Sequence, residues 1–143
     1  MTRILFDTIA AGGGHVGTAR ALRAAVVRAS DGRVDGPVRD AMAELGFEAQ
    51  DRAHKRSWQR LLRTPRLVSL GQRAMDGLPW LVRGVLARWL DGLARALAND
   101  PQVTECDLVV ANHPFLMIAY ARARRRYGLR TPVVVLLTEA FDA

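Results

Sequence analysis

The sequence predicts an α/β fold in which a parallel sheet carries helices on both faces. Short apolar runs without polar alternation occur at 3–8, 107–111 and 132–137, which is typical of strands buried on both sides. Helical patterns separate these runs, as a parallel sheet requires. The glycine turn Gly12-Gly13-Gly14 joins the first run to a stretch rich in helix formers, so the chain begins strand, glycine turn, helix.

The length and composition fit one globular domain. The chain has 143 residues, half of them hydrophobic, and no apolar run reaches the roughly 18 residues of a membrane span. The N-terminus enters the first strand without the pattern of a secretory signal, so we expect a cytoplasmic protein. The single cysteine, Cys106, cannot form an internal disulfide, and the three histidines are not paired at metal-ligand spacing. We therefore expect no metal and no cofactor.

The first half of the chain contains a large helical insertion. After the strand at 3–8, a helix is expected at 15–29, followed by a second strand within 34–41 whose best core candidate is Val38. From about 44 to 98 the pattern is helical throughout.

Prolines and glycines divide the remaining chain. Pro65 suits the first turn of a helix, Gly77-Leu78-Pro79 is a break, and Asn99-Asp100-Pro101 is a stop. Between the break and the stop, the apolar spacing predicts one long helix at 80–98. The last elements expected are a strand at 107–111, a helix at 115–127 that begins after Pro114 and ends at Gly128, and a strand at 132–137.

Basic residues concentrate in the insertion. Between positions 51 and 95 there are ten basic and three acidic residues, which accounts for the whole net charge of +7. Such a surface suits an anionic partner, and the tryptophans favour a membrane surface over nucleic acid, since no recognition helix is evident. The candidate membrane-facing residues are Trp58, Arg60, Arg63, Arg66 and Trp80. The alternative is a solvated arginine face with the tryptophans, Trp89 above all, in the core.

Polar side chains follow three of the predicted strands. His15 lies after the first strand, Asn112 and His113 follow the strand at 107–111, and Glu139 follows the last one. Because ligands of parallel α/β sheets bind beyond the carboxyl ends of the strands, we expect these groups to converge on one crevice. A helix N-terminus favours the neutral form of His15, which can accept a proton from a hydroxyl group. Each of these residues has an alternative as a capping or solvated residue.

The glycine turn also satisfies a dinucleotide-binding pattern. Gly12-x-Gly14-x-x-Gly17 follows a strand and precedes a helix, and Asp35 or Asp40 is a candidate acid for a ribose. A phosphate-binding P-loop is excluded because no Gly-Lys-Ser/Thr follows. A dinucleotide-binding domain therefore remains an alternative function.

Three motifs in the same order resemble the monogalactosyldiacylglycerol synthase family, which includes processive diacylglycerol glucosyltransferases. They are Asp7-Thr8 with Gly12-Gly13-Gly14-His15, the strand and turn Asp107 to Pro114, and the strand Pro132 to Glu139. The resemblance implies the N-terminal half of a GT-B glycosyltransferase, in which two Rossmann-like domains face one cleft.

The family resemblance also implies roles for the site. Diacylglycerol would be the acceptor, and a UDP-hexose would bind through a C-terminal domain, without a metal. His15 would match the proposed catalytic base, Gly12 to Gly14 would lie near a phosphate or the acceptor headgroup, and His113 and Glu139 would line the acceptor side. Residues 1–143 would then be a single acceptor-binding domain, inactive alone, on the inner face of the cell membrane. The alternative from another class is a non-catalytic module that binds lipid surfaces.

Overall fold

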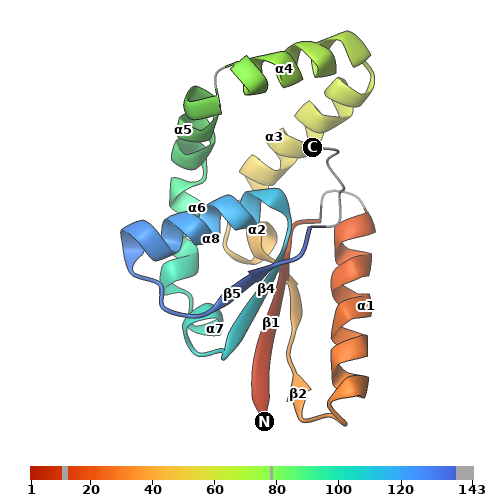
Figure 1. The fold of residues 1–143 in the computed structure, drawn as a ribbon, viewed down its shortest axis with the longest axis vertical. Helices are drawn as coiled ribbons and strands as arrows, with labels where there is room; N and C mark the ends of the chain where they lie inside the picture. Colours follow the sequence, from red (N-terminus) through yellow and green to blue (C-terminus); the bar gives the residue numbers. More distant parts are fainter. Residues whose placement is uncertain (11–12, 78, 138–143) are drawn as a thin grey trace.

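The computed structural model describes residues 1–10, 13–77 and 79–137, and it contains a parallel sheet with helices on both faces (Figure 1). Strand β1 (Thr2–Thr8) lies in the interior, next to β4 (Leu108–Asn112), and β4 pairs in turn with β5 (Val133–Val135). On the other side of β1 lie β2 (Val34–Asp35) and β3 (Val38–Asp40). All of these pairings are parallel, which confirms the predicted α/β class.

The predicted second strand is interrupted at Gly36-Pro37. A Cβ at Gly36 would lie 1.6 Å from the Ile4 carbonyl oxygen, so only glycine allows the chain to pass this close to β1. Pro37 has no N–H, but its carbonyl accepts a hydrogen bond from the Phe6 N–H at 3.0 Å. Val38 packs against the apolar cluster of Ile4 and Phe6, as predicted, but it is only half-buried, whereas its neighbour Arg39 is 3 % exposed.

Two apolar clusters hold the two layers of helices. Helix α1 (Gly13–Ala29) packs Leu22 and Val26 against Ile4 and Phe6 on one face of the sheet. The larger cluster, which includes the fully buried Leu93, lies on the opposite face. The helices on that side are α2 (Ala41–Glu44), α6 (Asp91–Asn99), α7 (Pro101–Thr104) and α8 (Pro114–Tyr127).

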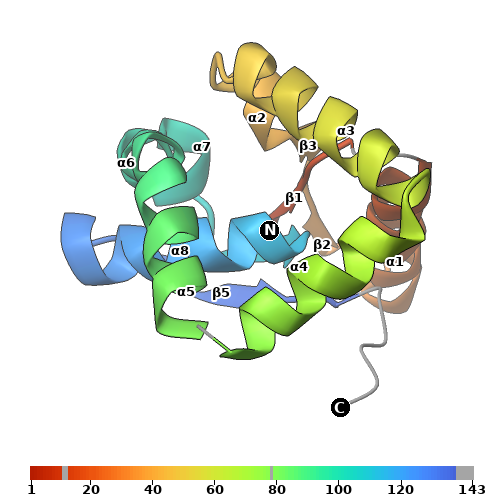
Figure 2. The ribbon, with the colours of Figure 1, turned by 90° about the horizontal axis from the view of Figure 1, so that it is seen from above.

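Three helices form an arm that stands away from the sheet. They are α3 (Glu48–Leu62), α4 (Pro65–Gly77) and α5 (Pro79–Trp89). Figures 1 and 2 show this helical arm at the carboxyl end of the strands, with α4 linking the outer ends of α3 and α5. At its base the Gln50 side-chain amide donates to the Trp89 carbonyl at 2.8 Å, so the two ends of the arm meet.

The predicted helix at 80–98 is wrong as a single element. The chain turns at Leu90, which is completely buried and lies between α5 and α6. Arg122 of α8 binds Asp91 at 2.5 Å, which holds the start of α6 against the body. The helical hydrogen-bond pattern resumes at once, since the Ala94 N–H donates to the Leu90 carbonyl four residues earlier at 2.9 Å. The helical spacing of the apolar residues therefore continues through the turn. The insertion is therefore shorter than predicted, since α6 belongs to the core.

The other predicted helix boundaries are confirmed. Pro65 and Pro114 begin α4 and α8, and Gly128 ends α8 in the left-handed region at φ 73°. Asp100 follows α6 and caps α7. Strand β5 is shorter than the predicted 132–137, and Cys106 is a half-buried free thiol.

Candidate functional site

The candidate site lies where the strand order reverses. β1 has β3 on one side and β4 on the other, and Thr8 pairs with Asn112 at the carboxyl ends of β1 and β4. Parallel α/β sheets bind ligands at such a switch point. Helices α1 and α8 both begin there, each directly after one of these two strands.

Asn112 fastens the first turn of α1 to the end of β4. Its side-chain amide donates to the His15 carbonyl at 2.7 Å, and both residues are buried, at 1 % and 8 % exposure. This single hydrogen bond joins segments 97 positions apart in the chain. The predicted meeting of His15 with Asn112 at one edge of the sheet is thereby confirmed.

His113 caps α8 with its own side chain. Its Nδ1 accepts a hydrogen bond from the Phe115 N–H at 3.1 Å, and its ring is 5 % exposed. An imidazole nitrogen that accepts has no proton, so the neutral ring carries its proton on Nε2. Burial, and then repulsion by His15 and His54, lower the pKa of His113 to about 3. At neutral pH His113 is therefore a neutral group that donates through Nε2–H.

The three histidines of the chain gather at this point. The ring centroids of His15 and His113 are 4.8 Å apart, and those of His54 and His113 are 5.9 Å apart. We call His15, His54 and His113 the histidine cluster. His54 comes from α3 of the helical arm, and sequence reasoning missed it because no local spacing relates position 54 to 15 or 113.

His54 lies half-buried at the arm side of the cluster. Burial lowers its pKa, and Lys55 lowers it further, whereas the Asp51 carboxylate acts in the opposite direction. Lys55 forms an ion pair with Asp51 one turn away, so the charges of these two residues offset one another beside His54.

Phe115 joins the cluster to both ends of the arm. Its ring centroid lies 4.5 Å from that of His54 on α3, 5.4 Å from that of Trp89 on α5 and 5.2 Å from that of His113. Trp89, which the alternative interpretation of the arm places in the core, is 38 % exposed and packs edge-on against Phe115. The arm and the site thus meet in one group of aromatic rings.

The structure describes two of the three predicted glycines, Gly13 and Gly14. Gly13 begins α1, and a Cβ on Gly14 would meet nothing within 4 Å, so open space adjoins the first turn of this helix. Gly12 and Glu139 lie outside the described residues. The expected convergence of Glu139 with the histidines therefore stays a prediction.

The predicted membrane-facing residues lie on the arm. Arg60 is in α3, Arg66 is in α4, Arg63 lies between them, and all three are exposed. Trp80 is 71 % exposed, which agrees with a surface position. Trp58 lies in α3, but its side chain is outside what the structure describes.

The two acids proposed for a dinucleotide ribose have partners within the chain. Asp35 binds Arg23 through two hydrogen bonds of 2.9 and 3.0 Å, which lower its pKa. Asp40 accepts from the Ala10 N–H at 3.1 Å and caps α2. These contacts count against the dinucleotide alternative.

A buried ionic network lies beneath the site, and sequence reasoning missed it. Arg39 donates to Asp7 at 2.7 Å and also binds Asp100, while the Tyr120 hydroxyl donates to Asp7 at 2.5 Å. Burial raises the pKa of Asp7 despite these partners, and the two carboxylates raise that of Arg39 despite burial. The network links β1, β3 and α8 just below the strand ends.

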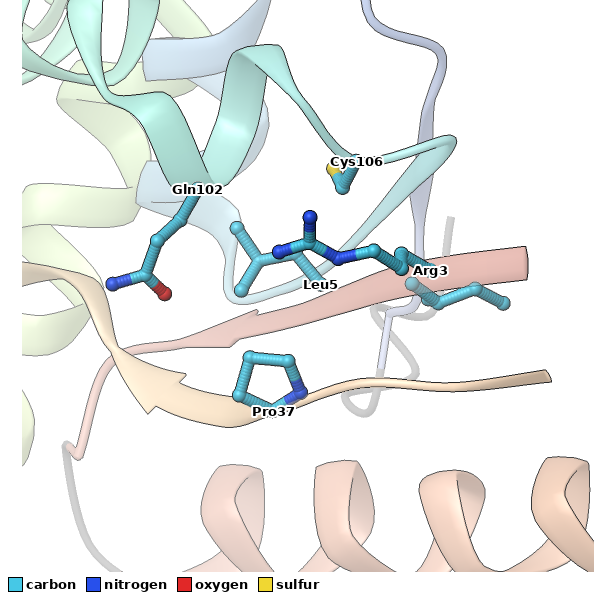
Figure 3. Close-up of a pocket in the computed structure, with 6 residues that line it drawn as sticks. Arg3, Leu5, Pro37, Gln102 and Cys106 are labelled. Atoms are coloured by element: carbon cyan, nitrogen blue, oxygen red, sulfur yellow. The ribbon is translucent and has the colours of Figure 1, made fainter. Parts of the chain in front are cut away.

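A small cavity lies at the opposite end of the strands (Figure 3). Arg3, Leu5, Pro37, Gln102 and Cys106 line it, and burial raises the pKa of the Cys106 thiol. A thiol that stays protonated is a poor nucleophile, so this cavity is not the better candidate.

Within the part of the chain that the structure describes, no helix is long and apolar enough to cross a membrane, and no group of three His, Cys, Asp or Glu side chains is arranged to hold a metal ion. Comparison with protein-family models, curated proteins and solved structures gave no match. Fold and site therefore define the class: a parallel α/β domain with a histidine-lined site at its switch point.

Proposed function

We propose that this chain is the acceptor-binding, N-terminal part of a GT-B hexosyltransferase of glycolipid biosynthesis. It would bind diacylglycerol or a related lipid at the inner face of the cell membrane, and a C-terminal domain would bind the UDP-hexose. The observation that carries the proposal is the meeting of His15 with His113 at the first turn of α1, at the carboxyl ends of β1 and β4.

The two histidines suit different parts of hexosyl transfer to the hydroxyl group of diacylglycerol. His15 would take the hydroxyl proton as the oxygen attacks the anomeric carbon of the sugar and the UDP leaves. The Nε2–H of His113 would donate to the hydroxyl oxygen and orient it, because its Nδ1 is held by the Phe115 N–H. Gly14 leaves room for the headgroup beside the first turn of α1.

Sugar transfer tests the catalytic part of the proposal. We expect a protein containing this chain and a donor domain to transfer a hexose from UDP-galactose or UDP-glucose to diacylglycerol. His15→Ala should lower the rate by at least about 100-fold, as loss of a general base does. Turnover by the 143-residue chain alone, or full activity of His15→Ala, would contradict the assignment.

Vesicle binding tests the arm separately. Each basic side chain at an anionic surface contributes about 1 kcal/mol, so Arg60→Gln with Arg63→Gln should weaken binding to anionic vesicles about 30-fold. The matched control is Arg20→Gln with Arg28→Gln, which removes the same charge from exposed positions on α1. Equal weakening by both pairs would show a general charge effect and contradict a membrane role for the arm.

The same assays separate the alternatives. A non-catalytic lipid-surface module would bind vesicles equally with and without His15 and would show no sugar transfer in any context. A dinucleotide-binding domain would be protected by NAD against thermal unfolding.

A further inference from the structure

A second basic surface lies at the end of α8 that is far from the candidate site. Residues 121–130 contain five arginines and no acidic residue, and they form the last turns of α8 and the turn that follows it. A helix rises about 1.5 Å per residue, so Arg126 lies about 20 Å along α8 from His113. This surface is therefore separate from the histidine cluster.

Arginines of α6 and α8 meet around one acid at this end. The two helices pack against each other on one face of the sheet (Figure 1). Arg122 donates to Asp91 at 2.5 Å, and Arg126 lies 4.0 Å from the same carboxylate oxygen. The hydrogen bond from Arg122 keeps the pKa of Asp91 below its usual value, so Asp91 is ionised and neutralises Arg122.

Tyr127 gathers the remaining two arginines. The guanidinium carbons of Arg95 and Arg126 lie 5.5 and 5.9 Å from the centroid of its ring, within the range of a cation–π contact. We call Arg95, Arg122 and Arg126 the arginine cluster. Its three positive charges against the one negative charge of Asp91 leave a surplus of +2, carried by Arg95 and Arg126. Both of these side chains are exposed, so a ligand can reach them.

We propose that the arginine cluster is a second binding site, in which Arg95 and Arg126 hold a phosphoryl group beside the ring of Tyr127. The site goes beyond the proposed function and does not depend on it, since it lies at the other end of α8 from the histidines. Arg122 keeps Asp91 occupied, so the carboxylate does not compete for the two free guanidinium groups.

The charge and the donors of the cluster favour a phosphoryl group over other anions. A phosphate monoester carries a charge of about −1.5 to −2 at neutral pH, which matches the surplus of +2. A guanidinium group donates two parallel N–H groups to a pair of phosphate oxygens, and Arg95 and Arg126 together offer two such forks. A ligand with one carboxylate would leave one of the two charges unmatched.

Tyrosine NMR is the direct test, because the chain has two tyrosines and Tyr127 is the one in contact with the arginine cluster. The probe is inorganic phosphate, added to the whole chain labelled with ¹³C-tyrosine, with sodium chloride at the same ionic strength as the reference. We expect saturable shifts of the Tyr127 ring signals with phosphate. Tyr120 is buried against Asp7, so its signals should not move and serve as the internal control. Tyr127 signals that respond equally to chloride and phosphate would overturn the proposal.

Variants that remove one charge make the test specific. Arg95→Gln and Arg126→Gln should each weaken phosphate binding about tenfold, the loss of one charge-assisted hydrogen bond. Arg20→Gln removes the same charge from an exposed position on α1 and should leave the affinity unchanged. His15→Ala should leave it unchanged as well, because the histidine cluster lies at the other end of α8. Equal weakening by Arg20→Gln, or loss of binding in His15→Ala, would contradict a site at the arginine cluster.

Vesicles separate the two possible sources of the phosphoryl group. Phosphatidate presents a phosphate monoester on a membrane, whereas a soluble phosphate ester reaches the site from solution. If the source is a lipid, Arg95→Gln with Arg126→Gln should weaken binding to phosphatidylcholine vesicles that contain phosphatidate at least about tenfold. If the source is soluble, the same double variant should lose phosphate binding and keep its affinity for these vesicles. Either result supports the site, and a double variant that binds phosphate as the wild type does would overturn it.

Discussion

Acid should unfold this protein through His113, and His113→Asn isolates the effect. The pKa of His113 falls from its usual value of 6.5 to about 3 in the folded chain. Between these two pH values the unfolded chain binds one more proton than the folded chain, so stability falls as the pH is lowered through this window. Above pH 6.5 the ring is neutral in both states, and the contribution is fully present.

The magnitude follows from the two pKa values. Each pH unit below about 6.5 costs about 1.4 kcal/mol, so the loss between pH 8 and pH 5 is about 2 kcal/mol. Asn caps the helix without titrating, so His113→Asn should lose about 2 kcal/mol less than the wild type over the same interval. Titrating groups that do not interact with His113, such as Asp7, are present in both proteins and cancel in the comparison.

Urea unfolding at pH 8, 6 and 5 measures both curves. The wild-type and His113→Asn free energies should diverge as the pH falls, with the variant gaining relative stability. Parallel curves would refute the assignment of His113 as a buried, neutral, capping imidazole. Histidine NMR at pH 6 gives a second check, because the Nε2–H tautomer has a characteristic pair of ¹⁵N shifts.

Two further predictions concern the body of the fold. Gly36→Ala should destabilise the chain by at least about 3 kcal/mol in urea unfolding, the upper end of overpacking, because its Cβ would lie 1.6 Å from the Ile4 carbonyl oxygen. A decrease of less than about 1 kcal/mol in the free energy of unfolding would show that Gly36 does not lie against Ile4 of β1. Arg39→Leu should cost about 3–5 kcal/mol at pH 8 by leaving Asp7 and Asp100 buried without their cation. Since burial raises the pKa of Asp7, this cost should shrink at pH 5, and a cost independent of pH would contradict the network.

Local patterns predicted much of the framework. Pro114 and Gly128 mark the ends of α8 because a ring without an N–H and a residue tolerant of positive φ act within one turn of the chain. The meeting of His15 with His113 was predictable as well, because parallel strands bring their carboxyl ends to one edge.

Long-range contacts account for what the sequence did not predict. His54 reaches the cluster through the packing of α3, which no spacing encodes. The turn at Leu90 leaves the apolar period intact, so periodicity could not reveal it. The burial of Arg39 depends on Asp7, 32 positions away, and on Asp100, 61 positions away. From the local sequence alone, an arginine next to Val38 is expected to face solvent.

The hydrogen bond between Gln50 and Trp89 gives the protein a modular construction. A segment whose two ends lie side by side can be lengthened, shortened or exchanged without moving the strands beneath it, since closing a connection costs little more for a long segment than for a short one. The sheet and its histidines can therefore keep their geometry while the helical arm adapts to a different surface. His54 and the contacts of Phe115 limit that freedom, because they tie the arm to the geometry of the site.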